Sequence, residues 1–180
     1  MKIKKYMQFI KEATDHKHEY GCVMLGLESP EWKNITDTID PDDIYNHPTD
    51  PTYGIEENPH VTLLYGIHSD VDDSEVEKII NNLKGQNLSV DILGIESFTN
   101  KDFDVVKFGV KPSDQLKSAN QDLSKLPNTN KFPDYNPHIT VSYVKPGMAQ
   151  KYVDPNKKID FKIKDVVYSK ASGEKISYPI

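Results

Sequence analysis

Residues 59–65 read PHVTLLY and residues 137–143 read PHITVSY, so the chain carries two copies of one segment that begins with Pro-His and has Thr two places later. Both segments have the β-branched and aromatic composition of a buried strand. A helical segment and two strand-like segments follow the first copy, and a shorter helical segment and two strand-like segments follow the second. This order predicts an α+β fold with two similar halves and a cleft between them.

The other expected elements fit one domain that covers residues 1–180. Amphipathic patterns predict helices at 2–18, 30–39, 73–83 and 112–126, and a helical turn at 148–152. Apolar runs predict strands at 20–27, 60–67, 88–98, 103–110, 138–144, 159–169 and 174–180. Residues 40–58 are rich in Pro, Asp and Asn, and we expect them to form a long loop of a kind that is usually functional or mobile.

Each Pro-His segment places an imidazole and a hydroxyl on the same face of its strand, about 7 Å apart, because side chains alternate along a strand. The residues expected on these two faces are His60, Thr62 and Leu64 in the first copy and His138, Thr140 and Ser142 in the second. The opposite faces are apolar and are expected to pack into the core. Doubling the arrangement directs two imidazoles and two hydroxyls into one space.

Two histidines and two hydroxyls suit the cleavage of a phosphodiester without a metal. One neutral imidazole can remove a proton from an attacking hydroxyl or water, and one imidazolium can protonate the leaving oxygen. Histidine serves in both roles because its unperturbed pKa of about 6.5 lies near the working pH. The threonine hydroxyls can hold the oxygens of the phosphate.

A third His-x-Thr triplet, residues 47–49, shows that the spacing alone is weak evidence. Its middle residue is proline and it lies in the expected loop, so it is not predicted to be a central strand. The alternative for the other two triplets is a pair of buried histidines that are only hydrogen-bonded within a sheet. We favour the catalytic interpretation because both copies follow Pro, both have Tyr five places after the His, and both begin an equivalent unit.

The charge of the chain argues against binding to duplex DNA. Its 180 residues include 22 Lys and no Arg, and the formal net charge is −6. Residues 1–98 carry a net charge of −11 and residues 99–180 a net charge of +5. A protein that binds duplexes usually neutralises many phosphates with Lys and Arg. The asymmetry indicates either a solvated acidic face or a C-terminal half that supplies the cations of an anion pocket.

The sequence also predicts a cytoplasmic protein that has no membrane partner. Cys22 is the one cysteine of the chain, so neither an internal disulfide framework nor a multi-cysteine zinc site is expected. No apolar run approaches the about 18 residues that a membrane-spanning helix needs. The basic residues near Met1 are not followed by the apolar stretch of a secretory signal.

With its two Pro-His segments, the chain resembles the two-histidine (2H) phosphoesterase superfamily. Members of this superfamily carry paired motifs of His, a hydrophobic residue, Thr and a hydrophobic residue. The resemblance implies a bilobal α+β fold of two pseudo-symmetric lobes around a central cleft. It implies that His60 and His138 act as general acid and base, that Thr62 and Thr140 bind phosphate, and that neither a metal nor another cofactor is needed. The superfamily includes RNA ligase-like proteins and 2′,3′-cyclic phosphodiesterases.

Two further phrases, YGCVM at residues 20–24 and GIEENPH at residues 54–60, resemble phage-encoded members. These include the anti-CBASS nucleases, which cut the cyclic oligonucleotide messengers of bacterial antiphage signalling. The resemblance thus predicts a cyclic di- or trinucleotide as substrate. The alternatives are a short RNA with a 2′,3′-cyclic phosphate, cut by an RNA ligase-like enzyme, and a non-catalytic protein that only binds a nucleotide.

Two aromatic residues at strand ends, Tyr20 and Phe98, are candidates for stacking on a nucleobase. Such stacking is worth about 1–3 kcal/mol per base. Aromatic residues at strand ends also often form the rim of a core, and that interpretation remains open for both.

Overall fold

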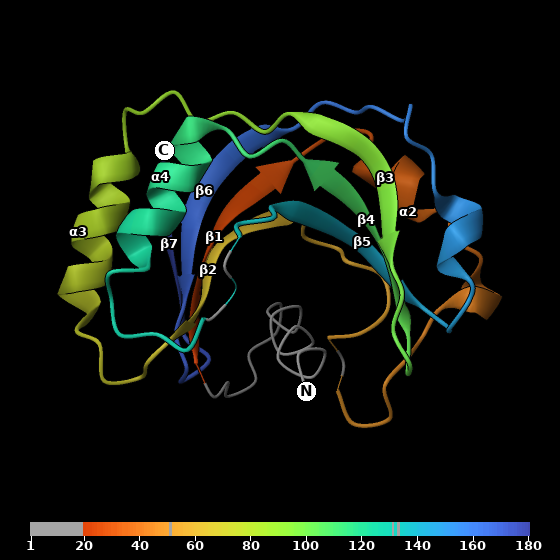
Figure 1. Ribbon diagram of the computed structural model, residues 1–180, viewed down its shortest axis with the longest axis horizontal. Coiled ribbons are helices and arrows are strands. Elements are labelled where there is room, and N and C mark those ends of the chain that lie inside the picture. Colours follow the sequence, from red (N-terminus) through yellow and green to blue (C-terminus); the bar gives the residue numbers. More distant parts are fainter. Residues whose placement is uncertain (1–19, 51, 131, 133) are drawn as a thin grey trace.

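The computed structural model describes residues 20–50, 52–130, 132 and 134–180, and its strands form an arch of two antiparallel sheets (Figure 1). The helix expected at 2–18 lies outside the described residues. One sheet has the order β2-β1-β6-β7 and the other the order β3-β4-β5. Their strands are β1 Gly21–Glu28, β2 His60–Ile67, β3 Ile92–Phe98, β4 Asp104–Val110, β5 His138–Val144, β6 Lys162–Ser169 and β7 Lys175–Pro179. The predicted α+β class is confirmed.

The two repeated units of the sequence are interleaved between the sheets. Strand β2 belongs to the four-stranded sheet, but the strand pair that follows it, β3 and β4, lies with β5 in the three-stranded sheet. The pair that follows β5 returns to the sheet of β2. Each sheet is therefore built from both units. Strands β2 and β5 are edge strands in contact with each other, so the two Pro-His segments meet where the sheets adjoin.

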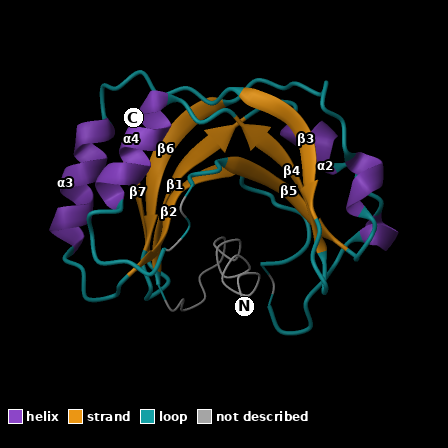
Figure 2. Ribbon diagram, viewed as in Figure 1, coloured by secondary structure: helices purple, strands orange, loops and turns teal. Residues whose placement is uncertain are grey.

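Two amphipathic helices cover the outer side of the four-stranded sheet (Figure 2). Helix α3 spans Asp73–Leu83, as predicted, and begins where the carboxylate of Asp72 accepts a hydrogen bond from the backbone N–H of Ser74. Helix α4 spans Asp114–Leu123, and Ser113 caps it in the same way. Their buried residues, Val76, Ile80, Leu83, Leu116, Ala119 and Leu123, join the main core.

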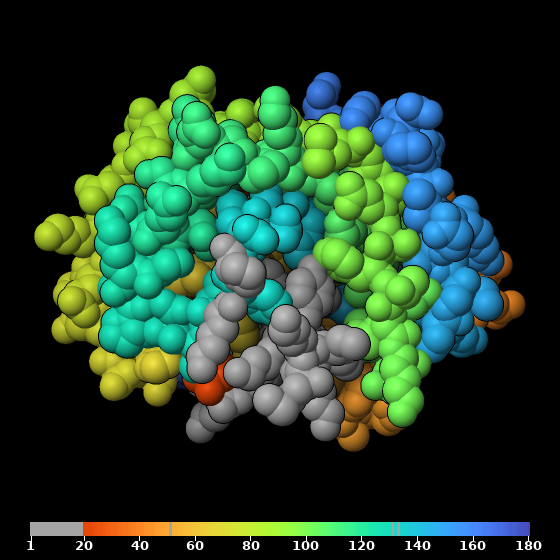
Figure 3. Space-filling model, in the orientation of Figure 1, coloured from red at the N-terminus to blue at the C-terminus, as the bar shows by residue number. Residues whose placement is uncertain are grey.

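The three-stranded sheet has shorter helical pieces on its outer side. These are α2 Trp32–Thr36 and the 3₁₀ helices η1 Pro41–Asp43 and η2 Ala149–Tyr152. The indole of Trp32 packs against Phe108 and Phe161, with ring centroids 6.4 and 5.8 Å away. In the space-filling view, the blue segment that contains η2 forms the flank opposite α3 and α4 (Figure 3).

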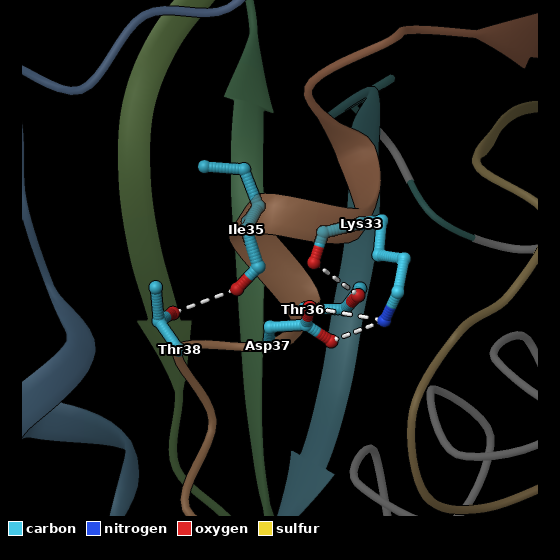
Figure 4. A network of polar contacts seen from close by, with 5 residues as sticks. All are labelled: Lys33, Ile35, Thr36, Asp37 and Thr38. Atoms are coloured by element: carbon cyan, nitrogen blue, oxygen red, sulfur yellow. Dashed lines mark hydrogen bonds and ion pairs between the residues drawn. The ribbon is translucent and has the colours of Figure 1, made fainter.

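Helix α2 is shorter than the expected 30–39 because the chain tightens into i→i+3 bonds, in which Thr38 and Ile39 donate their backbone N–H groups to the carbonyls of Ile35 and Thr36. The hydroxyl of Thr36 donates to the carbonyl of Lys33, and that of Thr38 donates to the carbonyl of Ile35 (Figure 4). Asp37 pairs with the ammonium group of Lys33 at 2.8 Å. Hydroxyl groups that bond backbone carbonyls compete with continued helix formation.

The long loop expected at 40–58 contains η1 and covers the free edge of β5. Tyr45 donates its backbone N–H to the carbonyl of Tyr143, and Tyr143 donates its own to the carbonyl of Gly54. Further along, Glu56 donates its N–H to the carbonyl of Val141. An uncovered sheet edge would expose unpaired backbone groups, so this loop protects β5 and sets its position.

Candidate active site where the two sheets adjoin

His60 and His138 begin the two edge strands and are anchored in the same way. The Nδ1 atom of His60 lies 2.9 Å from the carbonyl oxygen of Asn58, and that of His138 lies 3.1 Å from the carbonyl oxygen of Asn136. A carbonyl oxygen only accepts, so Nδ1 carries the proton and donates it. This tautomer leaves Nε2 of each ring to exchange protons with a substrate. Both copies of the motif thus extend back to Asn-Pro-His, although the bond uses the backbone carbonyl of the Asn and not its side chain.

Each histidine also pairs across strands with a glycine, Gly26 of β1 for the first and Gly109 of β4 for the second. Both glycines make room for a carboxylate from the third strand. A methyl group on Gly26 would lie 2.0 Å from Oδ1 of Asp165, and one on Gly109 would lie 2.4 Å from Oε1 of Glu96. The two carboxylates are thus part of the repeated arrangement, although nothing in the local motif pointed to them.

A β-bulge interrupts each edge strand directly after the motif threonine. The extra residue is Leu63 in β2 and Val141 in β5. A bulge adds one residue and shifts the alternation of side chains beyond it. The expectation that Leu64 and Ser142 share the face of the His and Thr is therefore wrong. They pair instead with Val23 and Val106, on the faces that Val61 and Ile139 share.

The carbonyl group of each bulged residue has a partner from outside its sheet. Asn120 of α4 donates from Nδ2 to the carbonyl of Leu63 at 2.6 Å. The backbone N–H of Glu56 donates to the carbonyl of Val141 at 3.0 Å. These bonds hold the bulges, and the motif threonines beside them, in fixed positions.

Burial distinguishes the two histidines. His138 is only 9% exposed, whereas His60 is partly exposed. The pKa of His138 is lowered to about 4, chiefly by burial and to a smaller extent by the positive charges of Lys107 and His60, against the opposing effect of its bond to Asn136. The effect of His60 on His138 means that the two rings share one electrostatic environment. Thr62 and Thr140 are buried beside them, at 8% and 7% exposure.

A cavity of about 290 Å³ opens beside His60. Its walls include Met24, Asp165 and Lys175 from the neighbouring strands. Asp165 is 7% exposed and accepts a hydrogen bond of 2.5 Å from the hydroxyl of Ser177. Small-molecule pockets are typically roughly 300–1,000 Å³, so this cavity lies at the small end of their sizes.

The two aromatic candidates lie in different places. The ring of Phe98 is edge-on to that of His138, with centroids 5.5 Å apart, and the Nζ atom of Lys107 lies 4.2 Å from its centroid. The ring of Tyr20 packs against that of Tyr65, with centroids 6.2 Å apart. Tyr20 lies six residues before Gly26, the strand partner of His60. At about 3.3 Å per residue, that is roughly 20 Å along the strand, so only Phe98 is close to a motif histidine.

The third triplet forms a local turn. His47 makes an isolated bridge with Asp50, and its ring stacks on Tyr53 with centroids 5.3 Å apart. Nδ1 of His47 accepts from the backbone N–H of Thr49, and Thr49 is exposed. This triplet is therefore not part of a strand, as its proline predicted.

Within residues 20–50, 52–130, 132 and 134–180, no three His, Cys, Asp or Glu side chains are grouped so that they could hold a metal ion. The same part of the chain contains no helix that is long and apolar enough to span a membrane.

Comparison with known families decides the relationship, because the model of the 2′-5′ RNA ligase superfamily matches residues 30–170. The chain belongs to this superfamily. The match spans both His-x-Thr strands and confirms the predicted membership of the 2H phosphoesterases. This membership implies a phosphoesterase or phosphodiesterase activity. No curated protein matches the sequence.

Solved structures are similar to this chain at low sequence identity. Usb1 of Kluyveromyces marxianus with uridine monophosphate is 12% identical, with a TM-score of 0.56 over 91% of this chain and 99% of that chain. E. coli LigT complexed with NADP⁺ is 13% identical, with a TM-score of 0.44 over 90% of this chain and 95% of that chain. At these identities the likeness to Usb1 supports the fold alone.

Proposed function

We propose that this protein cleaves a 3′–5′ phosphodiester bond in a cyclic di- or trinucleotide, with no metal ion in the chemical step. The observation that carries the proposal is the pair of imidazoles at the junction of the sheets, each held through Nδ1 by the carbonyl of an asparagine two residues before it. Both Nε2 atoms are then available for proton transfer, and a buried threonine hydroxyl accompanies each ring.

The proposed reaction uses a hydroxyl group of the substrate as nucleophile. One histidine removes the proton of the ribose 2′-hydroxyl, whose oxygen then attacks the neighbouring phosphorus. The bond from phosphorus to the 5′-oxygen breaks, and the other histidine protonates that oxygen. A 2′,3′-cyclic phosphate end forms, which water can open in a second step. Thr62 and Thr140 would donate hydrogen bonds to the non-bridging oxygens as charge develops.

A compact substrate fits the charge and the cavity better than a long RNA does. The chain has no arginine and a net charge of −6, which opposes contact with many phosphates. The cavity beside His60 is small, about 290 Å³, and Lys164 and Lys175 line it. Phe98, beside His138, is the better placed of the two proposed base contacts. The resemblance to anti-CBASS nucleases supports a messenger of antiphage signalling as the substrate, cut in the cytoplasm of the host cell.

The second candidate is the cleavage of a short RNA end. The description of the matched family, and the uridine monophosphate in the Usb1 structure, favour this substrate. The same two histidines would act on it, so only the substrate distinguishes the two candidates.

A panel of substrates tests the proposal. The purified full chain is incubated in excess EDTA with cyclic dinucleotides, cyclic trinucleotides and short RNAs that end in a 2′,3′-cyclic phosphate. We expect turnover of a cyclic oligonucleotide, and a loss of about 10²–10⁴-fold in kcat for His60→Ala and for His138→Ala. The double variant should be little worse than either single one, because the two groups act as a unit.

Each of the other outcomes would overturn one part of the proposed function. Turnover that EDTA removes and Zn²⁺ or Mn²⁺ restores would exclude the metal-free step. Turnover of the RNA ends alone would replace the cyclic substrate by the second candidate. Binding without turnover of any substrate would make the protein a nucleotide-binding relative that has kept the fold.

A further inference from the structure

The two motif histidines stand in half-sites that match in the histidine, in the threonine and in the glycine opposite the histidine. The His60 half-site comprises His60, Thr62, Met24, Gly26 and Asp165, and the His138 half-site comprises His138, Thr140, Lys107, Gly109 and Glu96. Both have a histidine opposite a glycine and a carboxylate whose end lies over that glycine, although Asp165 pairs with Gly26 itself and Glu96 pairs with Lys107. The residue opposite the threonine differs, because it is Met24 in one and Lys107 in the other.

Lys107 is fixed in place by its surroundings. It is only 5% exposed, and its Nζ atom lies 2.6 Å from a carboxylate oxygen of Glu96 and 4.2 Å from the centroid of Phe98. The side chain of Glu96 is 47% exposed, so water screens the carboxylate more than the ammonium group. A buried ammonium group needs such partners to stay charged.

The geometry connects this cation to His138. Phe98, whose face carries the ammonium group, presents its ring edge-on to the imidazole at 5.5 Å. The charged groups that act on His138 from the packed strands are Lys107 of β4, Glu96 of β3 and His60 of β2. The effect of Lys107 on the pKa of His138 is larger than the opposite effect of Glu96.

We propose that Lys107, which has no counterpart in the His60 half-site, is a positioning residue that keeps His138 neutral and thereby makes His138 the general base and His60 the general acid. The division of roles rests on the phosphodiesterase function proposed above, whereas the action of Lys107 on His138 does not. A pseudo-symmetric site could run the reaction in either sense, and the burial of His138 together with the charge of Lys107 removes that freedom.

The roles follow from where a positive charge is tolerated. His138 is buried and lies within the electrostatic reach of Lys107, so a second positive charge on its ring is opposed by both burial and repulsion. The neutral ring has its Nε2 lone pair ready to accept the proton of the 2′-hydroxyl. His60 is partly exposed, with uncharged Met24 at the position that Lys107 holds in the other half-site. Its imidazolium form can therefore be solvated and can donate a proton to the leaving 5′-oxygen.

Histidine titration by NMR tests the action of Lys107 without any substrate. Signals of His60 and His138 are assigned by comparison with the His60→Gln and His138→Gln variants, and their midpoints are followed in the full chain. Lys107→Met gives Thr140 the same uncharged strand partner that Thr62 has in Met24. It should raise the midpoint of His138 by about one pH unit, since a nearby charge typically shifts a pKa by about 1–3 units. Lys107→Arg retains the charge and should leave the midpoint near that of the wild type.

A second variant covers the case in which Lys107→Met leaves Glu96 unpaired and the chain does not fold. In Lys107→Met/Glu96→Leu both charges are absent, and replacing an ion pair by apolar groups is often tolerated. The midpoint of His138 should then lie between those of the wild type and the single variant. An unchanged or lower midpoint in the folded variants would overturn the action of Lys107.

The division of roles is tested with two leaving groups. A nucleoside 3′-(4-nitrophenyl phosphate) releases nitrophenolate, which leaves without protonation, and so it needs the general base alone. With this substrate, the kcat of His60→Gln should lie within about tenfold of that of the wild type. The kcat of His138→Gln should stay about 10²–10⁴-fold lower than that of the wild type. Equal losses in the two variants, or recovery of His138→Gln instead, would overturn the assignment. A wild type inactive on every phosphodiester, with the NMR shifts intact, would count against the proposed function alone.

Discussion

Asn120 of α4 donates a hydrogen bond of 2.6 Å to the carbonyl oxygen of Leu63, the residue that bulges out of β2 directly after Thr62. Asn120→Ala would leave this carbonyl without its partner, and an unsatisfied buried polar group costs about 1–3 kcal/mol. We expect urea unfolding to show a loss of that size. Activity should fall as well, because the bulge positions the hydroxyl of Thr62.

Gln121, the next residue of the helix, provides the control because it is exposed. The free energy of unfolding of Gln121→Ala should stay within about 0.5 kcal/mol of that of the wild type. Equal stability of the two variants would mean that the bond from Asn120 does not hold the bulge.

Much of the fold could be predicted because its main signals are local. The helix at 73–83 and the strands at 60–67 and 138–144 have the predicted bounds, since an amphipathic stripe and two apolar runs define them within a few residues. The paired motif located the two histidines for the same reason. The proline in the third triplet correctly excluded it from a strand.

The rest depends on contacts between residues far apart in the sequence. Asp165 and Glu96 come to the site only because strand pairing places Asp165 beside Gly26 and Glu96 beside Lys107. The bulges are set by partners such as Asn120, so alternation in the sequence did not predict the faces of the residues that follow. The interleaving of the two units between the sheets is likewise a property of the chain's path rather than of any segment.

The buried His138 should make the stability of the fold depend on pH. Its pKa is about 4 in the folded protein, against about 6.5 when the chain is unfolded. Between these values the unfolded state binds more protons, so the stability contributed by the neutral ring is full above pH 6.5 and is lost as pH falls towards 4. The free energy of unfolding should be about 2–3 kcal/mol lower at pH 4.5 than at pH 7 through this group alone.

The measurement is urea unfolding of the wild type and of His138→Gln at both pH values. The difference between the two proteins isolates this histidine from every other titrating group. On acidification, the free energy of unfolding of His138→Gln should fall by about 2–3 kcal/mol less than that of the wild type. The same pH dependence in both proteins would contradict the low pKa.

The two glycines opposite the histidines should respond differently to alanine. In Gly26→Ala the new methyl group meets Asp165, which is buried and held by Ser177, so strain of about 1–3 kcal/mol is expected. In Gly109→Ala it meets the end of Glu96, a half-exposed side chain that can swing into solvent. Urea unfolding should therefore rank Gly26→Ala as the less stable variant, and the reverse order would show that Asp165 moves easily.

Loss of the motif hydroxyls should slow the reaction less than loss of either histidine. Thr62→Val and Thr140→Val keep the shape and the strand preference of the side chain but remove its hydrogen bond. A bond to a charged group is worth about 1.5–3 kcal/mol, so each variant should lower kcat/KM by roughly 10–150-fold. Steady-state kinetics on the substrate found with the panel measures this loss.

Thr49 provides the matched control, since it has the same spacing from a histidine but is exposed in a local turn. Thr49→Val should leave kcat and KM within about twofold of the wild type, as exposed substitutions away from a site usually do. A loss that matches that of Thr62→Val would mean that residues 47–49 reach the substrate. The two edge strands would then not supply the whole site, because the loop beside β5 would contribute to it as well.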